Sequence, residues 1–350
     1  MRRFTVMKKM KKLLYVLLIA VLIMPVIPAI PTAAATTKTP APAYNGKWTY
    51  YAIDNTIYKL NSQDGTAKKV KEVKDVAYIS DISYYDGYLY FTSNYYAGSD
   101  ASDNFVCCMK TNGTSYEKLG RGYRPAIYNK KIYYLKTKHV QTQDGEVYDQ
   151  TTSVSEMSLT GKNSRVIVKS NETNYLMWSL GVANGKVYYQ RYIDSSKQYA
   201  AMSYDIKSGK TQKLFTESDN IQIVSADASY LYYNIGYDTV GVYEIKTGKL
   251  YTKHYSDTIH VIGGKNGTAY FSRYDTHSTY AYHAKENKVT TLIKNRLLSD
   301  MTFSKSGYHV VEYTMTQEEY EASGYKYDMA MARMKINGTG FKILKKYFVS

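Results

Sequence analysis

A short sequence unit recurs seven times along this chain: a tight-turn pair, then a strand ending in two adjacent aromatic or β-branched residues. The last residues of successive units are separated by 40, 43, 55, 44, 38 and 40 positions. A period near 40 residues, with several short strands in each repeat, is typical of propeller blades. The seven pairs are Tyr50-Tyr51, Tyr90-Phe91, Tyr133-Tyr134, Tyr188-Tyr189, Tyr232-Tyr233, Tyr270-Phe271 and Val310-Val311.

A second turn signal follows each pair, usually a polar residue and glycine such as Ser208-Gly209 or Thr247-Gly248. Each unit therefore predicts two hairpins, strand A to strand B through the first turn and strand C to strand D through the second. Four antiparallel strands make one blade. We predict an all-β chain with a single β-propeller over residues 45–350, built of seven four-stranded blades, with six or eight as alternatives.

The aromatic pairs fit the packing of a blade. Neighbouring residues on a strand point to opposite faces of the sheet, so one ring of each pair would be in water if the sheet had a wet face. A blade lies between two others and both its faces are dry, so we predict that both members are buried. A tyrosine ring fills the wedge-shaped space between neighbouring blades, while its hydroxyl reaches polar backbone or solvent. Packing explains 41 tyrosines beside only 8 phenylalanines better than a catalytic use would.

Residues 1–35 are predicted to be a secretory signal peptide. Six basic residues precede an apolar stretch from Leu13 to Ile30, and Ala33-Ala34-Ala35 supplies the small residues that a signal peptidase recognises. The alternative is an uncleaved anchor, because a stretch of this length is about long enough to span a bilayer. Residues 36–44 are predicted to form a short extended linker.

Cleavage after residue 35 would take six positive charges from the +16 of the whole chain and leave +10. A net positive charge of this size suits anionic partners such as wall polymers. The reading favoured by the sequence is that lysines scattered over strand edges and turns keep the chain soluble and block edge pairing. No basic run with interleaved aromatics occurs, so no nucleic-acid partner is expected. We expect a secreted monomer, in contact with the cell wall or free of it, without a transmembrane helix in the mature chain.

Cys107 and Cys108 are adjacent on one predicted strand and point to opposite faces, so two buried free thiols are expected. No Cys/His spacing resembles a zinc site, and no Gly-x-Ser-x-Gly or His-Glu-x-x-His motif occurs. We therefore predict no metal, no cofactor and no catalytic residue. Carboxylates contributed by several blades would leave no local pattern, so a carbohydrate-active hydrolase or lyase stays open as the alternative.

The units differ most in the segments that join strand B to strand C: 94–104, 137–152 and 316–327 are long, whereas unit one has only a few residues there. In a four-stranded meander these segments share one face with the connections between blades, and loops on a rigid scaffold are where binding residues tend to be. Tyrosine beside aspartate on these segments suits a sugar or a peptide, although aspartate also simply initiates turns. The predicted ligand-binding residues are Tyr96, Asp100, Asp103, Tyr148, Tyr192, Asp194, Tyr237, Asp238, Tyr274 and Asp275.

The repeat resembles known propeller families. The unit (Asp/Asn)-Gly-x-φ-Tyr-(Tyr/Phe), with a strand C ending in a polar-Gly turn as in residues 201–210 and 109–114, is similar to the YWTD-type blades of low-density-lipoprotein-receptor propellers. It resembles secreted bacterial propellers of unknown function and TolB-type propellers more closely. The Trp-Thr-Asp of the receptor blades is absent, Tyr90-Phe91-Thr92-Ser93 being nearest, so the resemblance implies a fold and assigns no ligand-binding role to any position.

From these observations we predict a secreted, non-catalytic binding or scaffold module whose ligand is a cell-wall polymer, a glycan or a partner protein. Unit one has little sequence upstream that could serve as its strand A. We therefore expect either the C-terminal tail, residues 345–350, or residues 38–44 to supply the missing strand and close the ring.

Overall fold

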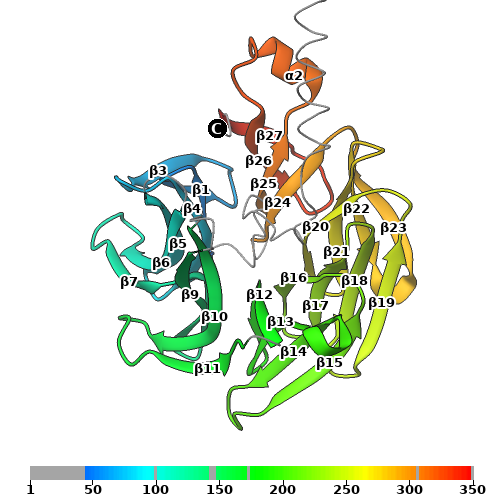
Figure 1. The fold of residues 1–350 in the computed structure, drawn as a ribbon. Coiled ribbons are helices and arrows are strands. Elements are labelled where there is room, and N and C mark those ends of the chain that lie inside the picture. Colours follow the sequence, from blue (N-terminus) through cyan, green and yellow to red (C-terminus); the bar gives the residue numbers. More distant parts are fainter. Residues whose placement is uncertain (1–43, 98–100, 142–146, 172–173, 305–306, 348–350) are drawn as a thin grey trace, which may run out of the picture. The chain divides into compact units, whose positions relative to one another are not determined.

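A computed structural model describes residues 44–97, 101–141, 147–171, 174–304 and 307–347 (Figure 1). The predicted signal peptide and all of the predicted linker except Tyr44 lie outside the described residues. In the part that is described, no helix is both long and apolar enough to cross a bilayer.

The described chain forms seven antiparallel sheets, each built from consecutive strands, as the paired hairpins predicted. Six have four strands and the first has three. The strands are β1 (Trp48–Ile53), β2 (Thr56–Asn61) and β3 (Ala67–Glu72) in blade 1; β4 (Tyr78–Tyr85), β5 (Tyr88–Ala97), β6 (Ala101–Lys110) and β7 (Glu117–Arg121) in blade 2; β8 (Tyr123–Tyr128), β9 (Lys131–Gln141), β10 (Val147–Ser158) and β11 (Arg165–Lys169) in blade 3; β12 (Asn174–Ala183), β13 (Lys186–Ile193), β14 (Gln198–Asp205) and β15 (Thr211–Glu217) in blade 4; β16 (Ile221–Ala226), β17 (Tyr230–Ile235), β18 (Thr239–Glu244) and β19 (Lys249–His254) in blade 5; β20 (Ile259–Lys265), β21 (Thr268–Arg273), β22 (Ser278–His283) and β23 (Lys288–Ile293) in blade 6; and β24 (Leu297–Thr302), β25 (Tyr308–Thr314), β26 (Met329–Lys335) and β27 (Lys342–Tyr347) in blade 7. Three short helices interrupt the connections: η1 (Asp194–Ser196), η2 (Ala284–Glu286) and α2 (Gln317–Ala322).

The sheets are arranged around a common centre, with the first strand of each blade innermost (Figure 1). The first strands of neighbouring blades contact one another, as β4 does β8 and β16 does β20. The architecture is a seven-bladed β-propeller. The turns predicted from sequence hold it together locally: Asn184 and Gly185 both have positive φ, as a two-residue hairpin turn requires, and Asn287 takes φ 48° where its unit lacks glycine.

The aromatic pairs form the interfaces between blades, and every member is buried. Each of the seven hydrophobic clusters joins the first member of one blade's pair to the second member of the next blade's pair, so both faces of every blade are used. The partners are Tyr50 with Phe91, Tyr90 with Tyr134, Tyr133 with Tyr189, Tyr188 with Tyr233, Tyr232 with Phe271, Tyr270 with Val311, and Val310 with Tyr51.

The last of these clusters closes the ring. Tyr51, Ile53 and Leu60 of blade 1 pack against Val310, Met331 and Tyr347 of blade 7. The expectation that the tail supplies a strand to blade 1 is wrong for its described part, because residues 345–347 pair with β26 as the fourth strand of blade 7. On the other edge, Tyr44 pairs with Thr49 of β1, where a fourth strand of blade 1 would lie.

Two of the segments interpreted as long B–C loops are extended hairpins instead. Strands β5 and β6 pair in continuous register to Ala97 and Ala101, and β9 and β10 pair to Gln141 and Val147 with a register shift between Thr151 and Ser153. Residues 137–152 include four threonines and two valines, which favour strands, and pairing satisfies the backbone groups of both segments. Cys107 and Cys108 are buried free thiols, as predicted.

Candidate functional site

The propeller has two chemically different faces. Because successive strands run in opposite directions, the A–B and C–D turns lie on one face, and the B–C segments and D–A connections lie on the other. We call these the turn face and the loop face. The loop face is the one that carries the predicted ligand-binding residues.

Exposed aromatic rings are confined to the loop face in the described residues. The three exposed large aliphatic side chains lie elsewhere: Val166 and Leu250 on outermost strands, Ile336 in a turn-face connection. Tyr237, Tyr325 and Tyr274 have exposed fractions of 80%, 62% and 51%. The exposed tyrosines are Tyr78, Tyr175, Tyr237, Tyr274, Tyr325 and Tyr327.

Three tyrosines form a row across the loop-face end of blade 4. Tyr175, Tyr192 and Tyr199 are cross-strand neighbours on β12, β13 and β14. The ring centroids of Tyr192 lie 5.0 Å from Tyr175 and 4.9 Å from Tyr199. Burial, and then the neighbouring Tyr192 hydroxyl, raises the pKa of both outer tyrosines, so Tyr175 and Tyr199 stay neutral hydroxyl donors at physiological pH.

Each end of this row meets charged groups. Asp194, in the turn after Tyr192, accepts a hydrogen bond from the ammonium of Lys197 at 2.5 Å. Asp219 and Tyr237 are close enough to Tyr199 to contribute to its raised pKa. The row therefore continues from blade 4 to blade 5, where the carbonyl of Tyr237 accepts from the backbone N–H of Ile259 at 2.6 Å.

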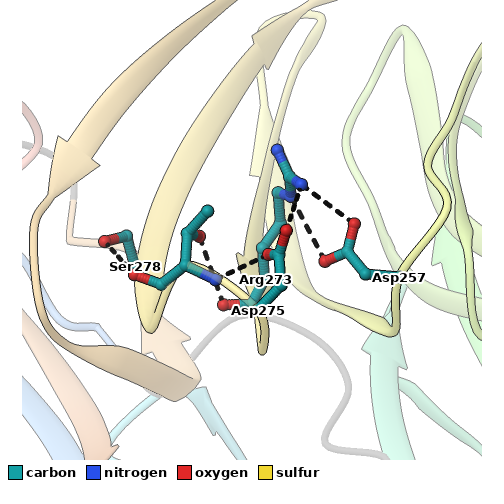
Figure 2. Close-up of polar contacts among 5 residues, drawn as sticks. Asp257, Arg273, Asp275 and Ser278 are labelled. Carbon is teal, nitrogen blue, oxygen red and sulfur yellow. Dashed lines mark hydrogen bonds and ion pairs between the residues drawn. The ribbon is translucent and has the colours of Figure 1, made fainter.

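Arg273 forms ion pairs with two carboxylates of the loop face (Figure 2). It ends β21, and its guanidinium nitrogen lies 2.9 Å from Asp257 and 2.6 Å from Asp275, with the ring of Tyr255 at 4.8 Å. Burial would raise the pKa of Asp275, but a hydrogen bond from the Thr276 N–H and the charge of Arg273 hold it below its usual value. Both predicted residues of this turn, Tyr274 and Asp275, are exposed beside it.

The B–C segment of blade 7 carries the short helix α2. Its first residue follows Thr316, whose hydroxyl accepts from the Glu319 N–H while the Glu319 carboxylate accepts from the Thr316 N–H. Glu319 also binds Arg296 at 2.7 Å. Burial opposes its ionisation, yet the Thr316 N–H and Arg296 hold the pKa of Glu319 below its usual value. The helix thereby positions Tyr320, which packs edge-on against the exposed Tyr325 at 5.3 Å.

Of the remaining predicted residues, two make side-chain contacts in the structure and three lie partly or wholly outside the description. Asp103 is an ion-pair partner of Arg121 at 2.7 Å and of His139, so it joins β6, β7 and β9. Asp238 accepts from Thr239 at 2.8 Å and lies 3.4 Å from His254. Tyr96 and Tyr148 lie on β5 and β10 with side chains outside the description, and Asp100 lies outside the described residues altogether.

The sequence prediction brought Tyr192, Asp194, Tyr237 and Asp238 to adjacent blades but missed several residues around them. Tyr175 was missed because it begins a first strand, and Asp257 because it lies in a D–A connection; only B–C segments had been searched. Since D–A connections share the loop face, a prediction that included them would have contained Asp257, whereas Tyr175 lies on β12 and carries no such signal. In the described residues, no group of three or more His, Cys, Asp or Glu is placed to hold a metal ion.

Comparison with known proteins supports the fold and leaves the function open. No protein-family model matches the sequence, and no curated protein matches it. Among solved structures, the chain resembles the β-propeller domain of the Trilobed protease from Pyrococcus furiosus, described as having an open velcro topology (TM-score 0.56, 12% identity, covering 89% of this chain and 99% of that one). It also resembles an oligogalacturonate lyase in complex with manganese (0.57, 11%, 88% and 86%). A prolyl endopeptidase matches at 0.60 with 10% identity over 88% of this chain, which spans about half of that protein's length (49%).

Proposed function

We propose that this chain is a secreted, non-catalytic binding module that holds a carbohydrate polymer, such as a cell-wall glycan, on its loop face. The observation that carries the proposal is the confinement of all six exposed tyrosines of the described residues to that face. Exposed apolar surface gathered on one face marks an interaction site, and rigid scaffolds place their binding residues on loops. A tyrosine ring stacks on the apolar face of a pyranose, and its hydroxyl bonds the sugar rim.

The polar groups beside the rings support a sugar ligand in particular. Asp194 and Asp275 are each held by a neighbouring cation, Lys197 and Arg273, at 2.5 Å and 2.6 Å. A carboxylate fixed in this way accepts hydrogen bonds from sugar hydroxyls without first losing conformational freedom. The face thus offers rings and ordered acceptors side by side, spread over blades 4, 5 and 6, as an extended polymer would need.

A carbohydrate-active hydrolase or lyase is the second candidate, and one observation favours it. Burial raises the pKa of Asp54, at the loop-face turn of blade 1, and the nearby Glu312 raises it further. Two neighbouring carboxyl groups, one of them with a raised pKa, are the pairing that glycosidases use. If the chain is a hydrolase or lyase, the wild-type protein should break down a polysaccharide, and the Asp54→Asn variant should not.

Binding of wall polysaccharides to residues 38–350 tests the proposal, with the variants Tyr237→Ala and Tyr274→Ala and the control Leu250→Ala. Loss of one stacking ring is worth about 0.5–1.5 kcal/mol, so each tyrosine variant should bind roughly 2- to 10-fold more weakly. The control removes an exposed apolar side chain from the outer strand β19 and should bind normally. Unchanged binding in both tyrosine variants, or binding of a protein and no glycan, would exclude the proposed ligand.

A further inference from the structure

The two faces of the propeller carry opposite charge. Counting side chains in the A–B and C–D turns and at the strand residues adjoining them, the described turn face has sixteen positive and seven negative groups. The positive groups are Lys47, Lys110, Lys130, Lys131, Lys162, Arg165, Lys186, Lys207, Lys210, Lys246, Lys249, Lys265, Lys285, Lys288, Lys335 and Lys342. The negative groups are Asp64, Asp86, Glu117, Asp205, Asp227, Glu244 and Glu286.

The same count on the described loop face gives the reverse balance, eight positive against thirteen negative groups. The positive groups are Lys74, Arg121, Lys169, Lys197, Arg273, Lys294, Arg296 and Lys326. The negative groups are Asp54, Glu72, Asp75, Asp194, Glu217, Asp219, Asp238, Asp257, Asp275, Glu318, Glu319, Glu321 and Asp328. The lysines are thus not scattered evenly, as solubility alone would allow.

Most turn-face cations have no carboxylate partner in the described residues. Only Lys131, Arg165 and Lys285 form ion pairs there, the first two with Glu156 and the third with Glu244. The turn-face carboxylates are instead engaged by the turns. Asp205 accepts from the Ser208 N–H at 2.7 Å, and hydrogen bonds of this kind hold its pKa below the usual value. Most of these lysines therefore contribute a positive charge that no carboxylate of the described residues neutralises.

The lysines are distributed in a way that suits a flat partner. Every blade contributes at least one, and in blades 4, 5 and 6 a lysine stands on each side of the C–D turn, as Lys207 and Lys210 do in blade 4. Short turns of similar length end at one face of a ring, so a planar surface reaches all of them together. A single polymer strand would follow only part of the ring.

We propose that the turn face docks on an anionic lipid bilayer, which leaves the acidic, tyrosine-bearing loop face directed away from the membrane. Lysines near an anionic bilayer each add to the attraction, and the effect falls off within a Debye length. No exposed aromatic ring lies on the described turn face, so attachment there is electrostatic, without deep insertion. The negative loop face would be repelled by the same lipids, and this repulsion fixes the orientation.

Co-sedimentation of residues 38–350 with vesicles tests the proposal. These residues form a compact unit of their own. Vesicles of phosphatidylcholine with about one-third phosphatidylglycerol should bind the protein at about 0.1 M salt and release it at about 1 M, and pure phosphatidylcholine should not bind it.

Two variants of equal charge separate the turn face from net charge. Replacing Lys207, Lys210, Lys246 and Lys249 with glutamine should reduce partitioning at least tenfold. Replacing Lys71, Lys74, Lys169 and Lys294, exposed lysines away from the turn face, should change it less than threefold. Equal losses in the two variants, or binding to soluble polyphosphate without binding to anionic vesicles, would overturn the proposal. Glycan binding is measured separately and fails or succeeds independently of this result.

Discussion

Gly264 shows how one residue makes room for the aromatic packing between blades. A Cβ atom at this position on β20 would lie 2.0 Å from a ring carbon of Tyr232, which is itself fully buried in the cluster with Phe271. The backbone of blade 6 thus contacts the Tyr232 ring of blade 5 directly, because Gly264 has no side chain between them. Gly241 and the ring of Tyr233 repeat the arrangement within blade 5.

Replacing Gly264 by alanine should therefore destabilise the protein. Overpacking a dense interface costs about 1–3 kcal/mol in free energy of unfolding, measured by denaturant titration. Gly120→Ala is the matched control, because its added methyl would meet only the sulfur of Met157 at 3.9 Å. A Gly264→Ala protein as stable as the control would show that the ring and backbone are less closely packed than described.

Residue-level reasoning from the sequence was strongest where the repeat was strict. Alternation along a strand predicted that both rings of a pair such as Tyr188-Tyr189 are buried, and this is confirmed. It could not separate Tyr175, which is exposed, from Tyr230, which is buried, because each begins a strand. Their exposure depends on which segment of the neighbouring blade covers them, and that is a tertiary property.

At the scale of elements, the turns were predictable and the long segments were not. Asn-Gly pairs determine the hairpin geometry locally, so their positions could be inferred from the chain alone. Whether residues 137–152 form a loop or a longer hairpin depends on pairing across the segment, which has no turn signal near its ends. The helix α2 did carry a signal, the capping box of Thr316 and Glu319, within the long B–C segment 316–327.

The contribution of the α2 helix to the stability of the protein should depend on pH, because Glu319 titrates. Its pKa is lowered in the folded protein, so its contribution to stability is present above the unfolded-state pKa and lost as pH falls through the folded value. Glu319→Gln should cost about 1 kcal/mol near neutral pH, a modest figure because the site is partly solvent-screened. Denaturant titrations across pH should show the difference from wild type shrinking below about pH 4.

The variant Glu318→Gln is the control for this measurement. Glu318 precedes Glu319 in the first turn of α2, outside the capping box. A pH-independent loss in Glu319→Gln, or an equal loss in Glu318→Gln, would contradict an ionised Glu319 bound to Arg296.

At the scale of the whole molecule, the ring is closed by side-chain packing between its first and last blades. Tyr347 of β27 packs with Tyr51 of blade 1, and the ammonium of Lys345 donates to the Tyr58 hydroxyl at 2.8 Å. The sequence predicted seven units and a missing first strand, because repeats are local. It predicted that an end of the domain closes the ring, but it did not predict that the tail does so by side-chain contacts from the fourth strand of blade 7, because that contact is a tertiary one.

Tyr347→Ala should weaken this seam. Removal of a large buried ring costs about 3 kcal/mol, enough to lower the Tm by several degrees in a domain of this size. The control Lys342→Ala changes an exposed residue at the start of the same strand and should melt like wild type. A Tyr347→Ala protein with an unchanged melting curve would mean that the seam is not formed by this cluster.

The central claim, that the loop face is the binding face, is tested most directly by hydroxyl-radical footprinting of residues 38–350 with and without a bound wall polysaccharide. Oxidation reports ring exposure, and Tyr237 and Tyr274 are exposed on that face in the free protein. The account predicts that bound polysaccharide protects these two tyrosines and leaves Leu250 and Ile336 as reactive as before. Protection of Ile336 on the turn face, with Tyr237 and Tyr274 unprotected, would contradict it.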